Sequence, residues 1–342
     1  MCSSDLLLTD GTRDATNGFA VTGTIGTGTI PATGAGARLM WYPGRAAFRA
    51  GEAYGSEWDD VNIGLRSVAM GYTTTASAEA STAMGFSATA SGQYSMAMGL
   101  FTVASGSGST AMGWLTSASG SNSTAMNRQT TASGYGATAM GSGTTASGNS
   151  STAMGIGTAA SGDGAIAMGL GTTAQAYGSL VIGRYNTVAG TPTSWVSTDP
   201  LFVAGNGTGT GASASDALTL YRNGNMTIAG TLTQSSDIRL KEDIEPLDGA
   251  LNNVLRLTPI SYRFRPGTGH PADREIGLSA QEVREIFPEL VSEDAQGFLA
   301  VAYPNLAAVL VKAVQEQQDQ IAALRGRIDR LDRKSTRLNS SH

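Results

Sequence analysis

Residues 81–106 read STAMGFSATASGQYSMAMGLFTVASG, and the Ala-Met-Gly triplet in this stretch returns at a fixed interval. Methionine occupies every fourteenth position from Met70 to Met168, and Ile182 takes the next position of the series. An Ala-Ser-Gly triplet follows about half a period later. A short fixed period of this kind indicates a solenoid in which each repeat forms one coil.

A coil of fourteen residues is too short for two helices. Its threonine-rich, glycine-punctuated sequence favours two short strands and two tight turns. The glycine that follows each methionine is replaced once, by Asn127, and asparagine is the residue that best tolerates left-handed backbone after glycine. We therefore expect a positive φ in this column and interpret it as a turn. Nine such coils, spaced ~4.8 Å apart, would form a rod of roughly 40 Å.

The two faces of the longer strand differ in side-chain size. Alternation along a strand places Thr82 and Met84 on one face and Ala83 on the other. We expect the methionine face to form the core, whereas the small alanine face could be covered by another chain. Because so thin a roll has little interior, we expect several rolls to pack side by side.

The repeat has the consensus x-T-A-M-G-x-x-T-T-A-S-G-x-x over residues 67–190. This pattern resembles the head repeats of YadA-like trimeric autotransporter adhesins. The resemblance implies a left-handed parallel β-roll that assembles as a trimer. The repeat is low in complexity, so it bears on architecture more than on ligand.

Three other interpretations of the repeat fit less well. Calcium-binding coils need aspartate in a glycine-rich register, and Asp163 is the only aspartate of the block. An ice-binding solenoid needs unbroken ranks of threonine, which Met96, Ile166 and Leu180 interrupt. A buried row of methionines is more often core than a metal or cofactor site.

Charge is distributed very unevenly along the chain. Residues 67–190 contain four charged side chains, whereas residues 235–331 contain 26. This shift indicates at least two structural regimes. The formal net charge of −5 argues against a nucleic-acid binder. With Cys2 the only cysteine, and His270 and His342 the only histidines, we expect no disulfide, metal or cofactor site.

The two ends look foreign to the protein. Residues 332–342, DRKSTRLNSSH, match the translation of a common sequencing adapter, and residues 1–6, MCSSDL, match its other end. We interpret both as adapter artefacts around a fragment that spans residues 7–331. The presence or absence of a secretion signal then carries no information.

The segments on either side of the repeat differ in character. We expect residues 7–66 to be a lead-in and an N-terminal cap of the roll. Trp41, Tyr42 and Trp58 would form the core of this cap or, alternatively, a glycan-binding platform. We expect residues 191–234 to form a short β-stalk, with Asn223-Gly224 at a hairpin turn.

Residues 235–312 carry a second resemblance. SSDIRLKEDI at 235–244, IGLSAQEV at 276–283 and the Tyr303-Pro304 pair resemble the endosialidase-type intramolecular chaperone domain of phage tailspikes and some bacterial surface proteins. The resemblance implies an α+β, trimeric folding aid that cuts itself off with a Ser-Lys dyad. By motif position, Ser236 would be the nucleophile and Lys241 the base. The cut would lie adjacent to Ser236, on a side that the motif does not fix.

The residue types are compatible with this role. A serine hydroxyl is a poor nucleophile without a base, and a desolvated lysine can serve as one. Residues 236 and 241 can meet on a bent or extended segment, although they would not share a face of a regular helix as i,i+4 pairs do. The chain shows no Gly-x-Ser-x-Gly motif that would support a conventional hydrolase.

Residues 313–331 should form a coiled coil. The apolar positions are spaced alternately by four and three residues: Leu310, Val314, Gln317, Ile321, Leu324, Ile328 and Leu331. Valine or isoleucine alternating with leucine would by itself favour a dimer. The seam is short and Gln317 interrupts it, whereas both resemblances imply a trimer. We therefore expect a trimer.

The fold expected is therefore mainly β: a left-handed parallel β-roll in a trimer, then a β-stalk, an α+β chaperone domain and a coiled-coil helix. We predict a homotrimeric surface or tail-fibre adhesin-like protein, extracellular, that binds a host-cell protein or glycan without inserting into the membrane. Two rivals remain. One is a tailspike enzyme whose catalytic part lies elsewhere, since the repeat shows no paired carboxylates. The other is a structural stalk with an uncleaved trimerisation domain.

Overall fold

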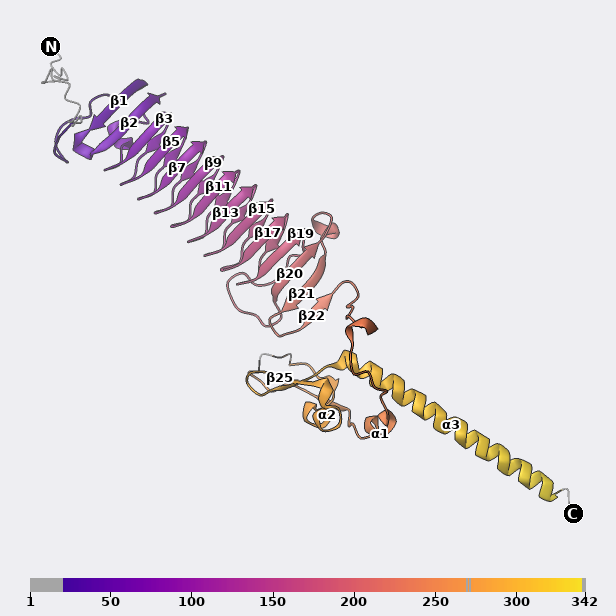
Figure 1. Ribbon diagram of the computed structural model, residues 1–342. Helices are drawn as coiled ribbons and strands as arrows, with labels where there is room; N and C mark the ends of the chain where they lie inside the picture. Colours follow the sequence, from indigo (N-terminus) through magenta and orange to yellow (C-terminus); the bar gives the residue numbers. More distant parts are fainter. Residues whose placement is uncertain (1–20, 269, 271, 340–342) are drawn as a thin grey trace, which may run out of the picture. The chain divides into compact units, whose positions relative to one another are not determined.

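The computed structural model describes residues 21–268, 270 and 272–339, and the chain divides into two compact units after Thr231 (Figure 1). The supposed adapter residues 1–6 and the end of the supposed C-terminal artefact, residues 340–342, lie outside this part. So does the lead-in up to residue 20.

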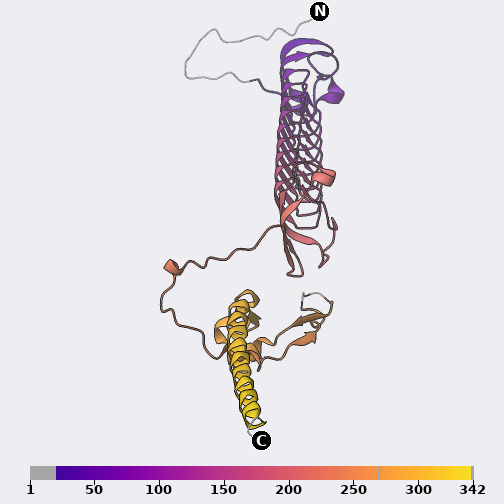
Figure 2. The same cartoon turned by 90° about the vertical axis from the view of Figure 1, so that its right-hand side faces the viewer.

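The first unit is a parallel β-roll, as expected (Figures 1 and 2). The long strands pair in parallel with a register of one repeat, so that Met84 lies opposite Met70 and Met98. The long strands are β3 (Val68–Tyr72), β5 (Thr82–Phe86), β7 (Met96–Leu100), β9 (Thr110–Trp114), β11 (Thr124–Arg128), β13 (Thr138–Ser142), β15 (Thr152–Ile156), β17 (Ile166–Leu170) and β19 (Leu180–Arg184). The short strands are β4 (Thr75–Ala76), β6 (Thr89–Ala90), β8 (Val103–Ala104), β10 (Ser117–Ala118), β12 (Thr131–Ala132), β14 (Thr145–Ala146), β16 (Ala159–Ala160) and β18 (Thr173–Ala174).

Alanine, not methionine, fills the interior of the roll. The alanines of the long and short strands, such as Ala83 and Ala90, are 0% exposed. The methionines of the long strands face outward, and Met70 and Met168 are 36% and 37% exposed. The expectation of a methionine core is therefore wrong. A coil of fourteen residues encloses a narrow space, and close packing admits only small side chains there.

The glycine column has the expected positive φ but lies within the strands. Gly85 and Gly113 have φ of 118° and 119°, and each occupies a paired position of its strand. A Cβ on Gly113 would lie 2.0 Å from the carbonyl oxygen of Asn127 on the next coil. Asn127 itself has φ 89°, so the tolerance expected of asparagine is confirmed. The interpretation as a turn is wrong, because the close approach of adjacent coils is what requires glycine.

The left-handed turn lies two residues after this glycine. Its φ values run from 42° to 65°. The column consists of Thr73, Ser87, Phe101, Leu115, Gln129, Gly143, Gly157, Gly171 and Tyr185. Each turn amide donates to the preceding coil, as when the Phe101 N–H binds the Phe86 carbonyl at 3.0 Å. The conformation is therefore imposed by the coil geometry and not by the residue present.

A hairpin of β1 (Gly36–Tyr42) and β2 (Ala47–Ala53) closes the N-terminal end of the roll, with β2 parallel to β3. Tyr42 and Trp58 are buried, and the Trp58 indole donates to the Thr74 carbonyl at 2.7 Å. Their burial rules out a glycan platform made of Trp41, Tyr42 and Trp58. These two aromatic side chains belong to the core of the cap instead.

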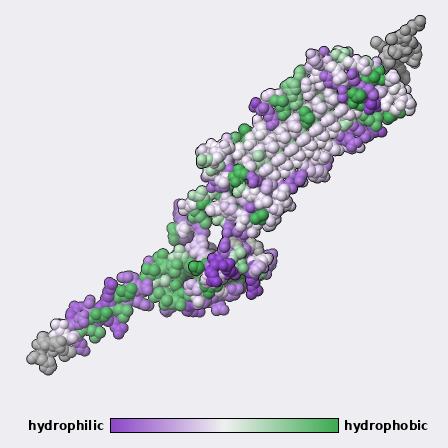
Figure 3. All heavy atoms as spheres, turned by 180° about the vertical axis from the view of Figure 1, so that it is seen from behind, coloured by the Kyte–Doolittle hydropathy of each residue, from purple (hydrophilic) through white to green (hydrophobic). Residues whose placement is uncertain are grey.

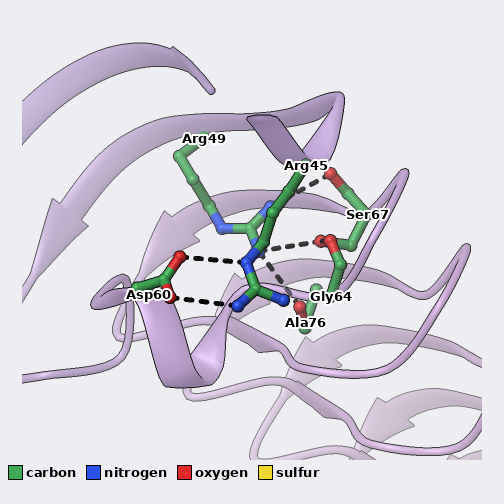
Figure 4. A network of polar contacts seen from close by, with 6 residues as sticks. All are labelled: Arg45, Arg49, Asp60, Gly64, Ser67 and Ala76. Atoms are coloured by element: carbon green, nitrogen blue, oxygen red, sulfur yellow. Dashed lines mark hydrogen bonds and ion pairs between the residues drawn. The ribbon is translucent and has the colours of Figure 1, made fainter. Parts of the chain in front are cut away.

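Arg49 lies fully buried at this end of the roll (Figure 4). Its guanidinium donates to the carbonyls of Phe48, Ser67 and Ala76 and to the Ser67 hydroxyl, at 2.9–3.0 Å. Burial lowers the pKa of Arg49 to about 10, which leaves it charged at neutral pH. The side chain thus supplies donors to carbonyls of the first coils. Nearby, Arg45 pairs with Asp60 at 3.0 Å.

The segment expected as a stalk continues the sheet of the roll. Strand β20 (Pro200–Asn206) pairs in parallel with β19, and β21 (Asp216–Tyr221) and β22 (Met226–Ile228) follow antiparallel. The turn at Asn223-Gly224 joins β21 to β22, so the predicted hairpin is confirmed. The side chain of Arg222 is fully buried, with Asp199 at 3.8 Å and the Trp195 ring at 4.4 Å.

The second unit combines helices and two small hairpins around one core. Its elements are α1 (Ala250–Val254), β23 (Ile260–Tyr262), β24 (Glu275–Gly277), α2 (Ala280–Ile286), β25 (Val291–Glu293), β26 (Leu299–Val301) and α3 (Tyr303–Asn339). Short 3₁₀ turns across both units are η1 (Pro43–Arg45), η2 (Asp60–Asn62), η3 (Gly211–Ser213), η4 (Ile238–Leu240) and η5 (Pro288–Leu290). Val283, Phe287 and Val309 are buried in the core. The Glu316 carboxylate of α3 accepts hydrogen bonds from the amides of Gly249 and Leu251, at 2.9 and 2.8 Å, and thereby caps α1.

Candidate functional site

The predicted dyad lies in a short turn near the start of the second unit. Asp237 precedes η4 and caps it, since its Oδ1 accepts a hydrogen bond from the Arg239 amide at 3.0 Å. Hydrogen bonds from the Arg239 side chain and amide hold the pKa of the Asp237 carboxyl below its usual value. Lys241 ends the turn, and its amide donates to the Ile238 carbonyl at 3.1 Å.

This turn brings Ser236 and Lys241 together. The Lys241 Nζ donates to the Ser236 Oγ at 2.9 Å. The five-residue spacing is spanned because η4 folds the chain back between the two side chains. Both residues are exposed, and within the described ranges no other side chain is hydrogen-bonded to either of them. The two atoms between which a proton would pass thus lie within hydrogen-bond distance.

The segment around the dyad presents apolar side chains to solvent. Its exposed apolar residues are Leu232, Ile238, Leu240, Ile244 and Leu247. Exposed apolar side chains so closely spaced along the chain are typical of a surface that another chain covers. The described residues contain no group of three or more acidic, cysteine or histidine side chains that could hold a metal.

Helix α3 carries the predicted heptad. Its apolar members are between 36% and 67% exposed in the single chain: Leu310, Val314, Ile321, Leu324, Ile328 and Leu331. The neighbouring Val309 and Ala313 pack instead into the core of the unit. The seam is therefore available to other copies, and the coiled coil itself stays a prediction.

A further surface of the roll was not anticipated from the sequence. Tyr72, Phe86, Leu100 and Trp114 occupy directly paired positions at the ends of successive strands β3, β5, β7 and β9. The turn residues Phe101 and Leu115 follow two of these strands. We call the six residues the apolar strip; Phe86, Leu100, Phe101, Trp114 and Leu115 are 36–45% exposed. The available signal was a large apolar residue two positions after methionine in four successive repeats.

Both family comparisons agree with the architecture. Residues 63–88, 76–102, 90–116, 104–126, 132–158 and 160–186 match the YadA head domain repeat, and residues 236–292 match the chaperone of endosialidase. The roll is built of YadA-type head repeats, and the second unit carries an endosialidase-type chaperone domain. The chaperone match begins at Ser236.

Curated relatives include tail-fibre proteins of bacteriophages. The chain is 33% identical over 98 residues to the long tail fiber protein Gp37 of Enterobacteria phage K3, which is 27% of this chain and 8% of that protein. It is 32% identical over 113 residues to the Gp37 protein of phage Ox2, which is 31% of this chain and 45% of that protein. The chain thus spans less than half the length of the relatives it matches.

No helix among the described residues has both the length and the apolar character needed to cross a membrane.

Proposed function

We propose that the chain belongs to a homotrimeric, adhesin-like fibre on a virion or a bacterial surface, whose second unit drives trimerisation and then cleaves itself off. The observation that carries the proposal is the 2.9 Å contact between Ser236 and Lys241 at the start of the chaperone match. The tail-fibre relatives and the adhesin-type repeats support the location outside the cell.

The outward methionine column supports self-association. It runs along every long strand from Met70 to Met168, and Ile182 continues it on β19. A thin roll buries little apolar surface by itself, so covering this face with further copies would add to the core. The exposed seam of α3 gives the same copies a second place to meet.

The chemistry would proceed from the serine hydroxyl. As the Ser236 Oγ attacks the carbonyl carbon of an adjacent peptide bond, Lys241 takes the hydroxyl proton and passes it to the departing amine. Water then hydrolyses the resulting ester. Because the nucleophile lies next to its own target, proximity replaces substrate binding, and each chain would react once.

The exposed position of the dyad makes cleavage depend on assembly. A lysine serves as a general base when it is removed from water. Lys241 is exposed in the single chain, so it would be desolvated only when other copies cover the apolar segment around η4. Cleavage should therefore follow trimer formation and be absent in denaturant.

Mass spectrometry of freshly folded protein tests this mechanism. The wild-type chain should split next to Ser236 without added protease, and the masses of the new ends should show which side is cut. Ser236→Ala and Lys241→Ala should each remain whole while keeping the trimer. Ser235→Ala is the matched control and should still cleave. Splitting of the Ser236→Ala variant would disprove the dyad.

The exposure of Lys241 also favours a second candidate. If no copy buries the amine, the second unit acts only as an uncleaved trimerisation module on a structural stalk. A wild-type trimer that stays whole would support this candidate over self-cleavage.

A further inference from the structure

Two residues of the apolar strip occupy backbone positions that disfavour them. Phe101 and Leu115 lie in the left-handed turn column with φ of 55° and 54°. Three coils of the same column carry glycine, at positions 143, 157 and 171, and the others carry Thr73, Ser87, Gln129 and Tyr185. A bulky residue at positive φ is destabilised relative to glycine or asparagine, and such outliers gather at functional sites. The coil sets the φ of this column, so a large apolar side chain at positions 101 and 115 gains no backbone stability from its place there.

The strip forms one continuous surface on adjacent coils. The Tyr72 and Phe86 rings stack with centroids 5.0 Å apart, and Phe86 meets Phe101 edge to face at 5.4 Å. At the far end, the Arg128 guanidinium lies over the Trp114 ring at 4.9 Å. Beyond Arg128 the strand-end position is filled by Ser142. Rings thus run along four coils and end in a cation.

The strip differs in extent from the surface expected between copies. The methionine column continues through all the long strands, as parallel copies in register would require. The apolar strip ends after β9, because Arg128 and Ser142 interrupt its column before Ile156 and Leu170 follow on β15 and β17. Taking ~200 Å² for a large side chain, its exposed part amounts to roughly 400 Å². A stable protein interface needs about 800 Å² per partner, so the strip is too small for one by itself.

We propose that the apolar strip binds an extended, uncharged or weakly anionic polysaccharide of a bacterial surface, an inference that rests on the proposed adhesin-like function. The flat C–H faces of successive sugar rings would stack on Phe86, Phe101 and Trp114, with Leu115 beside them. Hydroxyl groups beside the rings are present in Thr73 and Ser87, whose oxygens lie 2.7 Å apart. Arg128 would meet an occasional acidic sugar.

The surroundings of the strip fit a neutral partner. Residues 67–190 carry four charged side chains in all, and the one face of the roll that Figure 3 shows is made largely of residues of intermediate hydropathy. A surface so poor in charge lacks the basic groove that nucleic acid requires. Aromatic rings bordered by hydroxyls offer instead both an apolar face and a polar rim.

An array of purified bacterial surface polysaccharides, probed with the labelled trimer, tests the proposal. The wild type should bind at least one polysaccharide. The double variant Phe101→Asn/Leu115→Asn should lose that binding by at least tenfold, while its melting temperature stays equal or rises because asparagine relieves the turns. Ile156→Asn removes an exposed apolar residue from the Trp114 column outside the strip, and this control should bind as the wild type does.

Other results would overturn the proposal. A wild-type trimer that binds no polysaccharide, or a double variant that binds normally, would show that the strip is not the site. Dissociation of the double variant into monomers would show that the strip lies between copies. A lower melting temperature would show that the two side chains serve stability. Trimer formation and self-cleavage are measured without polysaccharide. Failure of the proposed function is therefore distinguishable from failure of polysaccharide binding by the strip.

Discussion

Replacing Gly113 by alanine tests how the coils are held together. A Cβ at this position would lie 2.0 Å from the carbonyl oxygen and 2.8 Å from the carbonyl carbon of Asn127. These are backbone atoms of the adjacent strand, so they cannot move aside as a flexible side chain could. The new methyl group can fit only if two coils separate, which weakens their hydrogen-bonded ladder.

The expected loss has two parts. An alanine held at φ 119° costs about 1–2 kcal/mol, and overpacking against the next coil adds about 1–3 kcal/mol. We therefore expect ~3 kcal/mol, which for a unit of this size lowers the melting temperature by roughly 6–12 °C. Gly143→Ala separates the two parts, since Gly143 has φ 65° with nothing within 4 Å of its Cβ, and should cost only ~1 kcal/mol.

Thermal melting followed by circular dichroism compares these variants under one set of conditions. Asn127→Gly completes the series and should stay within about 1 kcal/mol of the wild type, because asparagine already tolerates its φ of 89°. Equal shifts for Gly113→Ala and Gly143→Ala would refute the reasoning, because the contact with the adjacent coil would then carry no energy.

Three further predictions concern the ends of the molecule. Arg49→Met should lower the melting temperature by several degrees, because each buried carbonyl left without a donor costs about 1–3 kcal/mol. Amide hydrogen exchange should then rise first in β2 and β3. Unchanged exchange in these two strands would contradict the capping role of Arg49. A hydrogen bond from Arg45 and a weaker one from Tyr42 lower the pKa of the Asp60 carboxyl. The stability that the Asp60 carboxylate contributes is therefore present above about pH 4 and is lost as the pH falls through its folded-state pKa. The pair is partly exposed, so the acid-side loss of melting temperature should be small, and Asp60→Asn should abolish it. Leu324→Glu should weaken trimer formation at least tenfold in sedimentation, whereas Arg325→Glu, off the seam, should not.

The repeat could be predicted because its signals are local and repeated. A constant period sets the parallel register, and the Asn-Gly turn sets the hairpin between β21 and β22. The single asparagine in the glycine column correctly indicated positive φ at Asn127. Each of these features depends on backbone geometry that a few neighbouring residues determine.

The inner face of the roll could not be predicted from alternation. Both faces of the long strand are apolar, with Ala83 on one side and Met84 on the other, so the pattern alone gives no preference. The choice depends on the width of a closed coil, which is a tertiary property. The glycine column that includes Gly113 was wrongly interpreted as a turn for the same reason. The backbone atoms that exclude a Cβ at Gly113 belong to Asn127, a full repeat away in the sequence.

The dyad was partly predictable. Spacing allowed Ser236 and Lys241 to meet, and the resemblance assigned their roles, but the turn capped by Asp237 that joins them was not foreseen. Whether other copies bury Lys241 depends on contacts that a single chain does not contain.

The mass of the assembled Ser236→Ala chain tests the central claim most directly. This variant stays whole if the dyad is correct, so native mass spectrometry at micromolar concentration measures assembly without the complication of cleavage. The outward methionine column and the seam of α3 predict a species of three times the chain mass of 34.9 kDa. A stable monomer would contradict the account, because both apolar surfaces would then be tolerated in water without partners.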